Sequence, residues 1–155
     1  RVDPGEKTAD SPIFVEVDGD VRHPGVYGFA EPPAVGRLVH RAGGLTGTGG
    51  RGCSPAGDHV LPTGRRVVVG AASEGCVLDI GEMSAFYRVT LEIPIALNRA
   101  GTEDLTAVPG IGPATARSIV DERARRGGFK KMAELLSVPG IGPSVYAKIR
   151  PYLTL

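Results

Sequence analysis

The sequence of 155 residues predicts an α+β protein in which a small unit of strands and one helix precedes an all-α unit. Ile13, Val15 and Val17 recur at a period of two, which is typical of a half-buried strand. The sequence PGIGP occurs at 109–113 and again at 139–143, and such a fixed period indicates two copies of one supersecondary unit. The 23 glycines and 13 prolines favour short elements joined by turns, and they argue against a long-helix or coiled-coil protein.

Four apolar runs bounded by turn residues predict strands in the N-terminal half. They lie at residues 13–18, 26–29, 65–70 and 76–80. Val35, Leu38 and Val39 recur at helical spacing and predict a helix that ends at Gly43-Gly44. Residues 12–80 are therefore expected to form one α+β domain. Residues 1–11 have the composition of a linker or tail, and residues 46–57 form a Gly-rich loop. Residues 81–94 connect to a second domain at 95–155, and a further strand or a short helix is equally open for the apolar residues between 81 and 101.

A family resemblance is carried by the segment VDGDVRHPGVYGFAEPPAVGRLVHRAGGLT. This segment resembles the SLBB family, whose β-grasp module is written roughly V-x-G-x-V-x-x-P-G-V-Y. In that family the module is followed by a helix ending in A-G-G-L-T. The resemblance covers residues 15–46 and implies a β-grasp fold for the first domain. It does not imply a ligand, because SLBB domains occur in polysaccharide-export proteins, cobalamin carriers and DNA-uptake receptors. The glycines of this segment are equally explained by turns alone.

Cys53 and Cys76 are the only cysteines in the chain. Two such residues fit either one disulfide in an oxidising compartment or two unrelated thiols. His59 lies near Cys53, but no further ligand at a usual spacing completes a zinc site. We therefore expect no metal and no other cofactor.

The two copies of PGIGP are similar beyond the motif itself. The matching pairs are Leu105 with Leu135, Val108 with Val138, and Ile119 with Ile149. In the first copy, Thr102 is expected to cap a helix over 103–108, and a second helix begins at Pro113 and ends at Gly127-Gly128. The second copy predicts helices over 132–137 and 144–150, the latter stopped by Pro151.

Two helices joined by a Gly-Ile-Gly turn resemble the helix-hairpin-helix motif. A helix N-terminus offers unpaired N–H groups and a partial positive charge, and glycines let a phosphate approach them. Ile111 and Ile141 are expected to turn inward and hold the helices together. Binding should be directed at the phosphates of double-stranded DNA, independent of sequence and sensitive to salt. The expected contact residues are Gly110, Ile111, Gly112, Ala114, Thr115, Gly140, Ile141, Gly142, Ser144 and Val145.

The charge of the chain is divided unequally. Residues 94–155 hold nine Lys and Arg against five Asp and Glu, whereas residues 1–93 have an excess of acids. A basic C-terminal half indicates an anionic partner such as nucleic acid. Lys130, Lys131 and Lys148 are the basic residues expected to reach phosphates. Arg123, Arg125 and Arg126 lie at a helix C-terminus, where they complement the dipole, and Arg117 is expected to pair with Asp121.

The stretch from Ala96 to Leu153 is similar to ComEA-type competence proteins, which have an N-I-N-x-A-S-x-E-E-L opening, LPGIG, a G-x-F-x-x-x-x-D-L-L linker and V-P-G-I-G. Here the opening keeps one asparagine, Asn98, and Glu134 replaces the linker aspartate. The resemblance implies an extracytoplasmic receptor, in the periplasm or on the outer face of the membrane, held by an N-terminal anchor absent from this sequence. Such a receptor passes DNA to an uptake channel without cutting it. A Cys53–Cys76 bond fits that compartment, and self-association through the first domain is compatible with it.

Two other functions remain open from the sequence. One is an envelope protein–protein scaffold whose helix-hairpin-helix module is structural and binds no DNA. The other is a glycan or small-ligand module that uses the SLBB-like half. DNA glycosylases are the enzymatic rival, but Ala114 and Ser144 occupy the places where a resemblance to them requires a catalytic lysine. We expect no catalytic residue, no enzymatic activity and no small-molecule substrate.

Overall fold

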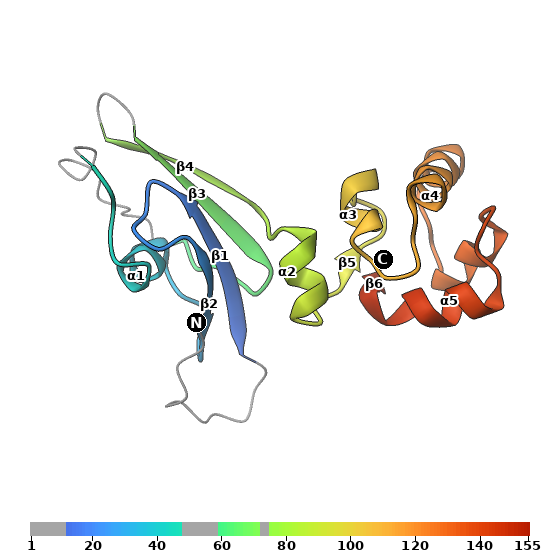
Figure 1. The fold of residues 1–155 in the computed structure, drawn as a ribbon, viewed down its shortest axis with the longest axis horizontal. Helices are drawn as coiled ribbons and strands as arrows, with labels where there is room; N and C mark the ends of the chain where they lie inside the picture. Colours follow the sequence, from blue (N-terminus) through green and yellow to red (C-terminus); the bar gives the residue numbers. More distant parts are fainter. Residues whose placement is uncertain (1–11, 48–58, 72–74) are drawn as a thin grey trace. The chain divides into compact units, whose positions relative to one another are not determined.

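The computed structural model describes residues 12–47, 59–71 and 75–155. The chain divides into two compact units, residues 1–83 and residues 84–155 (Figure 1). The first contains the strands of a mixed sheet and the second is almost entirely helical, so the predicted α+β class is confirmed.

The first unit is a four-stranded sheet with one helix on it. The elements are β1 (Ile13–Gly19), β2 (Gly25–Phe29), α1 (Val35–Arg41), β3 (Arg65–Ala71) and β4 (Cys76–Glu82). The strand order is β2-β1-β3-β4, with β1 antiparallel to β2 and parallel to β3, and β3 antiparallel to β4. Val17 and Val67 of the sheet and Leu38 of α1 are fully buried in one core. The four strands and the helix agree with those predicted from the sequence.

The period of two in β1 does not by itself decide which side chains are buried. Val15 and Val17 are buried as expected, but Glu16 is also only 6% exposed. The Arg66 guanidinium lies 3.7 Å from Glu16 Oε1 and donates a hydrogen bond of 2.7 Å to Asp18 Oδ2. This ion cluster compensates the burial of Glu16, because a buried carboxylate needs a nearby positive charge.

The possible cysteine pair falls partly outside the described residues. Cys76 is the first residue of β4, is partly buried and is not a free thiol. Cys53 and most of the Gly-rich loop that contains it lie outside the described residues. The pairing of Cys53 with Cys76 therefore stays a prediction.

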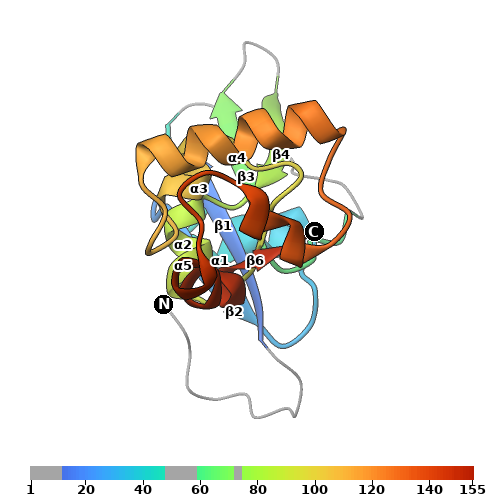
Figure 2. The same cartoon turned by 90° about the vertical axis from the view of Figure 1, so that its right-hand side faces the viewer.

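The second unit packs short helices around a single core. Its elements are α2 (Ala85–Thr90), β5 (Ile95–Ala96), α3 (Thr102–Thr106), α4 (Pro113–Arg126), the 3-10 helix η2 (Met132–Ser137), α5 (Pro143–Ile149), the 3-10 helix η3 (Arg150–Tyr152) and β6 (Leu153–Thr154). Helix α4 is the longest and runs along one side of the unit (Figure 2). None of the helices in the described ranges is long and apolar enough to cross a bilayer.

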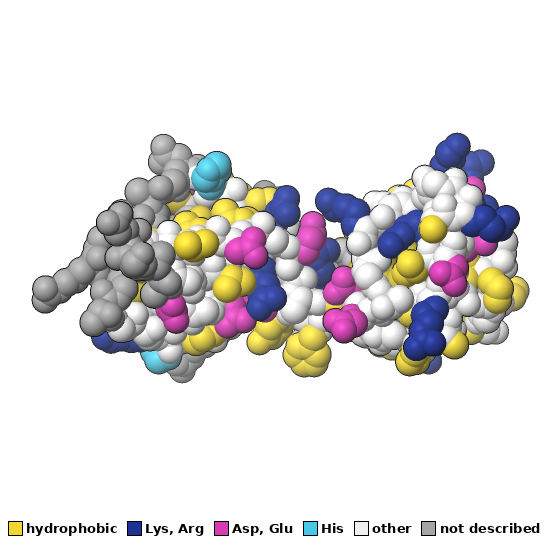
Figure 3. Space-filling view, turned by 90° about the horizontal axis from the view of Figure 1, so that it is seen from above, with side chains coloured by type: hydrophobic (Ala, Val, Ile, Leu, Met, Phe, Trp, Pro, Cys, Tyr) yellow, Lys and Arg dark blue, Asp and Glu magenta, His cyan; other side chains and the backbone are white. Residues whose placement is uncertain are grey.

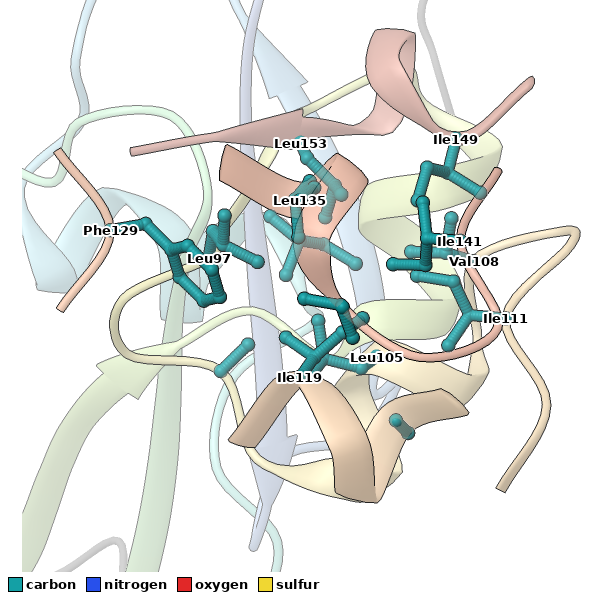
Figure 4. Close-up of a cluster of buried hydrophobic side chains, with 14 of the residues drawn as sticks. Leu97, Leu105, Val108, Ile111, Ile119, Phe129, Leu135, Ile141, Ile149 and Leu153 are labelled. Atoms are coloured by element: carbon teal, nitrogen blue, oxygen red, sulfur yellow. The ribbon is translucent and has the colours of Figure 1, made fainter. Parts of the chain in front are cut away.

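The matched residues of the two copies meet in this core. Leu105, Ile119 and their repeat partners Leu135 and Ile149 are all fully buried (Figure 4). An apolar residue is thus repeated every 30 positions because each copy contributes the same side chains to a shared interior. The predicted repeat architecture is confirmed.

The structure differs from the predicted elements at four places. Gly101, not Thr102, is the N-cap of α3, and its N–H donates to Asp104 Oδ2 at 3.2 Å. The first helix of the second copy is a 3-10 helix, and Pro151 lies within the 3-10 turn η3. Helix α2 is not among these differences, because a short helix was one of the two elements left open for this segment, and its Ala85 is buried in the second core. The parallel pair β5–β6 has no periodicity because each strand has only two residues.

Candidate nucleic-acid interface

The two PGIGP turns have the same backbone conformation. Gly110 has φ of +103° and Gly140 has φ of +90°, values that L side chains rarely adopt. The N–H of Ile111 donates to the Val108 carbonyl at 3.0 Å, and Ile141 makes the equivalent bond in the second copy. Both isoleucine side chains are 4% exposed and point into the core (Figure 4). They turn inward as predicted, so only their backbone faces the outside.

Each turn leads directly into the open N-terminus of a helix. Gly112 is the N-cap of α4, with φ of −87° and ψ of 174°, and Pro113 is the first helical residue. The first N–H to find a carbonyl within this helix is that of Ala116, which donates to Gly112 at 2.9 Å. The N–H groups of Ala114 and Thr115 precede it and have no acceptor within the helix. The surface at the start of α4 therefore offers donors for an anion.

The second copy repeats this arrangement. Gly142 is the N-cap of α5 with φ of −92°, and the Tyr146 N–H donates to its carbonyl at 2.9 Å. The N–H groups of Ser144 and Val145 correspond to those of the first copy. Gly112 and Gly142 are exposed, and a Cβ added at either would meet no atom within 4 Å. Access to both sets of donors is therefore open.

The two hairpins lie next to each other. A Cβ at Gly110 would come within 3.2 Å of Ile149 Cγ2 and 3.3 Å of Lys148 Cδ, both on α5. A Cβ at Gly140 would come within 3.2 Å of Thr115 Oγ1 on α4. The first glycine of each hairpin thus packs against the second helix of the other copy. Both open helix N-termini are consequently presented at the same end of the core.

The predicted lysines are distributed between the two ends of the unit. Lys148 touches the first hairpin, as the contact with Gly110 shows. Lys130 and Lys131 directly follow Phe129, which lies at the opposite end of the core from Ile111 and Ile141 (Figure 4). The structure therefore brings Lys148 to the hairpins but not the other two, whose contact with DNA stays a prediction. In Figure 3 the Lys and Arg side chains of this unit are spread over its face rather than gathered in one patch.

The arginines at the end of α4 serve the fold, as the sequence predicted. Arg123 donates to the carbonyls of Leu97 at 3.1 Å and Ala100 at 2.6 Å. Arg125 and Arg126 both bind the carboxylate of Glu122, which is only 8% exposed. These contacts use the guanidinium donors within the protein. The three arginines are therefore poor candidates for phosphate contacts.

Two residues of this unit have roles that the sequence did not indicate. Asn98 binds the backbone of Phe129 in both directions, with Nδ2 donating at 2.9 Å and Oδ1 accepting at 2.7 Å. Asn98 thus connects the opening segment of the domain to the linker between the two copies.

The expected ion pair between Arg117 and Asp121 is absent from the described part of the chain. Arg117 is exposed one turn after Pro113, so it is a further candidate for a phosphate contact.

Acid is expected to destabilise the second unit. Hydrogen bonds from Arg125 and then Arg126 lower the pKa of Glu122, and the backbone N–H groups of Lys130 and Lys131 lower the pKa of Glu134, in each case below 4.5. A carboxylate with a lowered folded-state pKa contributes stability above its unfolded pKa and loses it as pH falls through the folded value. We expect the melting temperature to drop on acidification below pH 4.5, and this drop to be smaller in Glu134→Gln. Thermal unfolding at a series of pH values, followed by circular dichroism, would show it, and identical profiles for the two proteins would contradict it.

Comparison with known proteins agrees with this geometry. Residues 92–154 match the helix-hairpin-helix motif family. They form a helix-hairpin-helix domain. Most of the chain is similar to ComE operon protein 1 of Bacillus subtilis (strain 168), with 24% identity over 150 residues that cover 92% of this chain and 69% of that protein.

The two findings together confirm the resemblance to ComEA-type proteins. The helix-hairpin-helix domain includes both hairpins and every helix of the second unit except α2. The similarity to the Bacillus protein extends over the first unit as well.

Among the described residues, no three His, Cys, Asp or Glu side chains converge on a site for a metal ion.

Proposed function

We propose that the chain binds double-stranded DNA independently of sequence and acts as an extracytoplasmic receptor in DNA uptake. The observation that supports this most strongly is the pair of open, glycine-capped helix N-termini at one end of the helix-hairpin-helix domain. Each of them presents backbone donors with no side chain in front. A phosphate of one strand would bind at Gly112, and a second phosphate would bind at Gly142.

The chemistry of these contacts explains why no sequence would be preferred. Backbone N–H groups and helix dipoles recognise the charged phosphate oxygens, which are the same at every base pair. The donors would be the N–H groups of Gly112, Ala114 and Thr115, with those of Gly142, Ser144 and Val145 in the second copy. The ammonium of Lys148 and the guanidinium of Arg117 would add charge beside them. Base edges would not be read, because the proposed donors contact phosphate oxygens, which carry no sequence information.

The cellular role is proposed from the resemblance to ComE operon protein 1. The chain would hold incoming DNA outside the cytoplasmic membrane and pass it to an uptake channel without cutting it. We propose no enzymatic activity, because binding and release of the backbone are sufficient for this task. Self-association through the first unit would place several weak sites on one duplex and raise the avidity.

Fluorescence anisotropy of a labelled duplex, titrated at several salt concentrations, tests the proposal. Because at least two phosphates would be neutralised, the logarithm of the binding constant should fall with the logarithm of the salt concentration with a slope of about −2 or steeper. Duplexes of unrelated sequence should give equal affinities. Absence of binding at low salt would contradict the proposal and favour an envelope scaffold instead.

A further inference from the structure

We propose that Lys148, which belongs to the second copy of the repeat, serves the phosphate site of the first hairpin. The two hairpins are then unequal, and the first is the stronger site. This inference rests on the proposed function, because it concerns how the same DNA contact is divided between the two copies. Position in the sequence alone would assign Lys148 to the second hairpin, because Lys148 lies in α5, the helix that directly follows this hairpin.

The contact between Lys148 and Gly110 supports this assignment. Lys148 Cδ and Cε lie 3.3 Å and 3.7 Å from the place that a Cβ at Gly110 would occupy. The aliphatic part of the lysine therefore lies over the first glycine of the first hairpin, and the ammonium follows one bond further along. Lysine commonly buries its stem on the protein and leaves its charged end in water. Gly110 thus has a second role, because its missing side chain leaves room for the lysine stem.

The second hairpin has no equivalent contact. The neighbour of Gly140 is the hydroxyl of Thr115, 3.2 Å from the position of a Cβ. The repeat partner of Lys148 is Ser118, whose hydroxyl donates to the carbonyl of Ala114 at 3.1 Å. A hydroxyl carries no net charge, and hydrogen bonds assisted by charge are about twice as strong as neutral ones.

The lengths of α4 and α5 also favour stronger phosphate binding at the first hairpin than at the second. Helix α4 has 14 residues, whereas α5 has seven before it passes into a 3-10 turn. The first hairpin therefore combines the longer aligned run of peptide dipoles with a nearby ammonium. The second hairpin has a short helix and a neutral neighbour. A phosphate should be held more tightly at Gly112 than at Gly142.

A double-mutant cycle separates the two assignments. Gly112→Asn and Gly142→Asn each place a neutral N-cap side chain on the donors of one hairpin, and asparagine cannot form an ion pair with Lys148. Lys148→Gln is then combined with each, and the affinity for a random duplex is measured by anisotropy at several salt concentrations. Lys148→Arg, which retains the charge, serves as the matched control.

We expect Lys148→Gln to weaken binding about fivefold, as for an exposed ion pair. The salt slope should become shallower by about 0.9, because one phosphate would no longer be neutralised by a lysine. The same loss should persist with Gly142→Asn and disappear with Gly112→Asn, because the lysine and Gly112 hold the same phosphate. Lys148→Arg should retain the wild-type slope, which a purely structural role of the side chain would not require.

Three results would overturn the inference. A loss that persists with Gly112→Asn and disappears with Gly142→Asn would assign Lys148 to its own hairpin. A salt slope unchanged by Lys148→Gln would remove the lysine from the contact, although the unchanged chain still binds DNA. If the unchanged chain binds no duplex even at low salt, the proposed function itself fails and this inference fails with it.

Discussion

Replacement of both Gly112 and Gly142 by aspartate is expected to abolish DNA binding and leave the fold intact. Neither glycine has a positive φ, and a Cβ at either meets no atom within 4 Å. Aspartate is a preferred N-cap residue, so its carboxylate would accept the helix N–H groups that we assign to the phosphate. It would also repel the DNA. Because each of the two hairpins would lose a charge-assisted contact with a phosphate, the affinity for DNA should fall at least about 100-fold.

The control for this prediction is a protein of the same net charge. Ala124 and Ala133 are exposed in α4 and η2, and neither is part of a hairpin. The variant with both alanines changed to glutamate should bind DNA much more tightly than the double aspartate variant at equal salt. Melting temperatures measured by circular dichroism should show the double aspartate variant to be as stable as the unchanged chain, or slightly more stable. Equal losses of affinity in the two variants would show that net charge, rather than the hairpins, determines binding.

Much of the helix-hairpin-helix domain could be predicted because its determinants are local or repeated. Pro113 at a first helical position and Gly127 at a C-cap with φ of 73° mark both ends of α4 by backbone rules alone. The inward direction of Ile111 was expected from the resemblance of its turn to the helix-hairpin-helix motif. The repeat then supplied the same conclusions for the second copy without further evidence.

The remaining features depend on contacts between residues distant in the sequence. Lys148 lies 38 positions after Gly110, and only the packing of α5 on the first hairpin brings them together. The expected partner of Arg117 was wrong because spacing on a helix permits an ion pair without requiring one. The two-residue strands β5 and β6 are too short to show a period, and they form because the ends of the domain meet. Sequence reasoning therefore identified the hairpins but not how charge is divided between them.

The four hairpin glycines are also expected to differ in their effect on stability. Gly110→Ala should lower the free energy of unfolding by about 2 kcal/mol, because φ of +103° is strained for an L residue and the new methyl group would come within 3.2 Å of Ile149. Gly112→Ala should change it by only about 0.5 kcal/mol, since its backbone is extended and its surroundings are open. Urea unfolding followed by the helical signal at 222 nm would measure both. This prediction assigns the two glycines different roles: Gly110 holds the hairpin in its conformation, and Gly112 leaves the helix N–H donors accessible. Similar losses of stability in the two variants would contradict this difference. The effect of a hairpin glycine on DNA binding could then not be separated from its effect on folding.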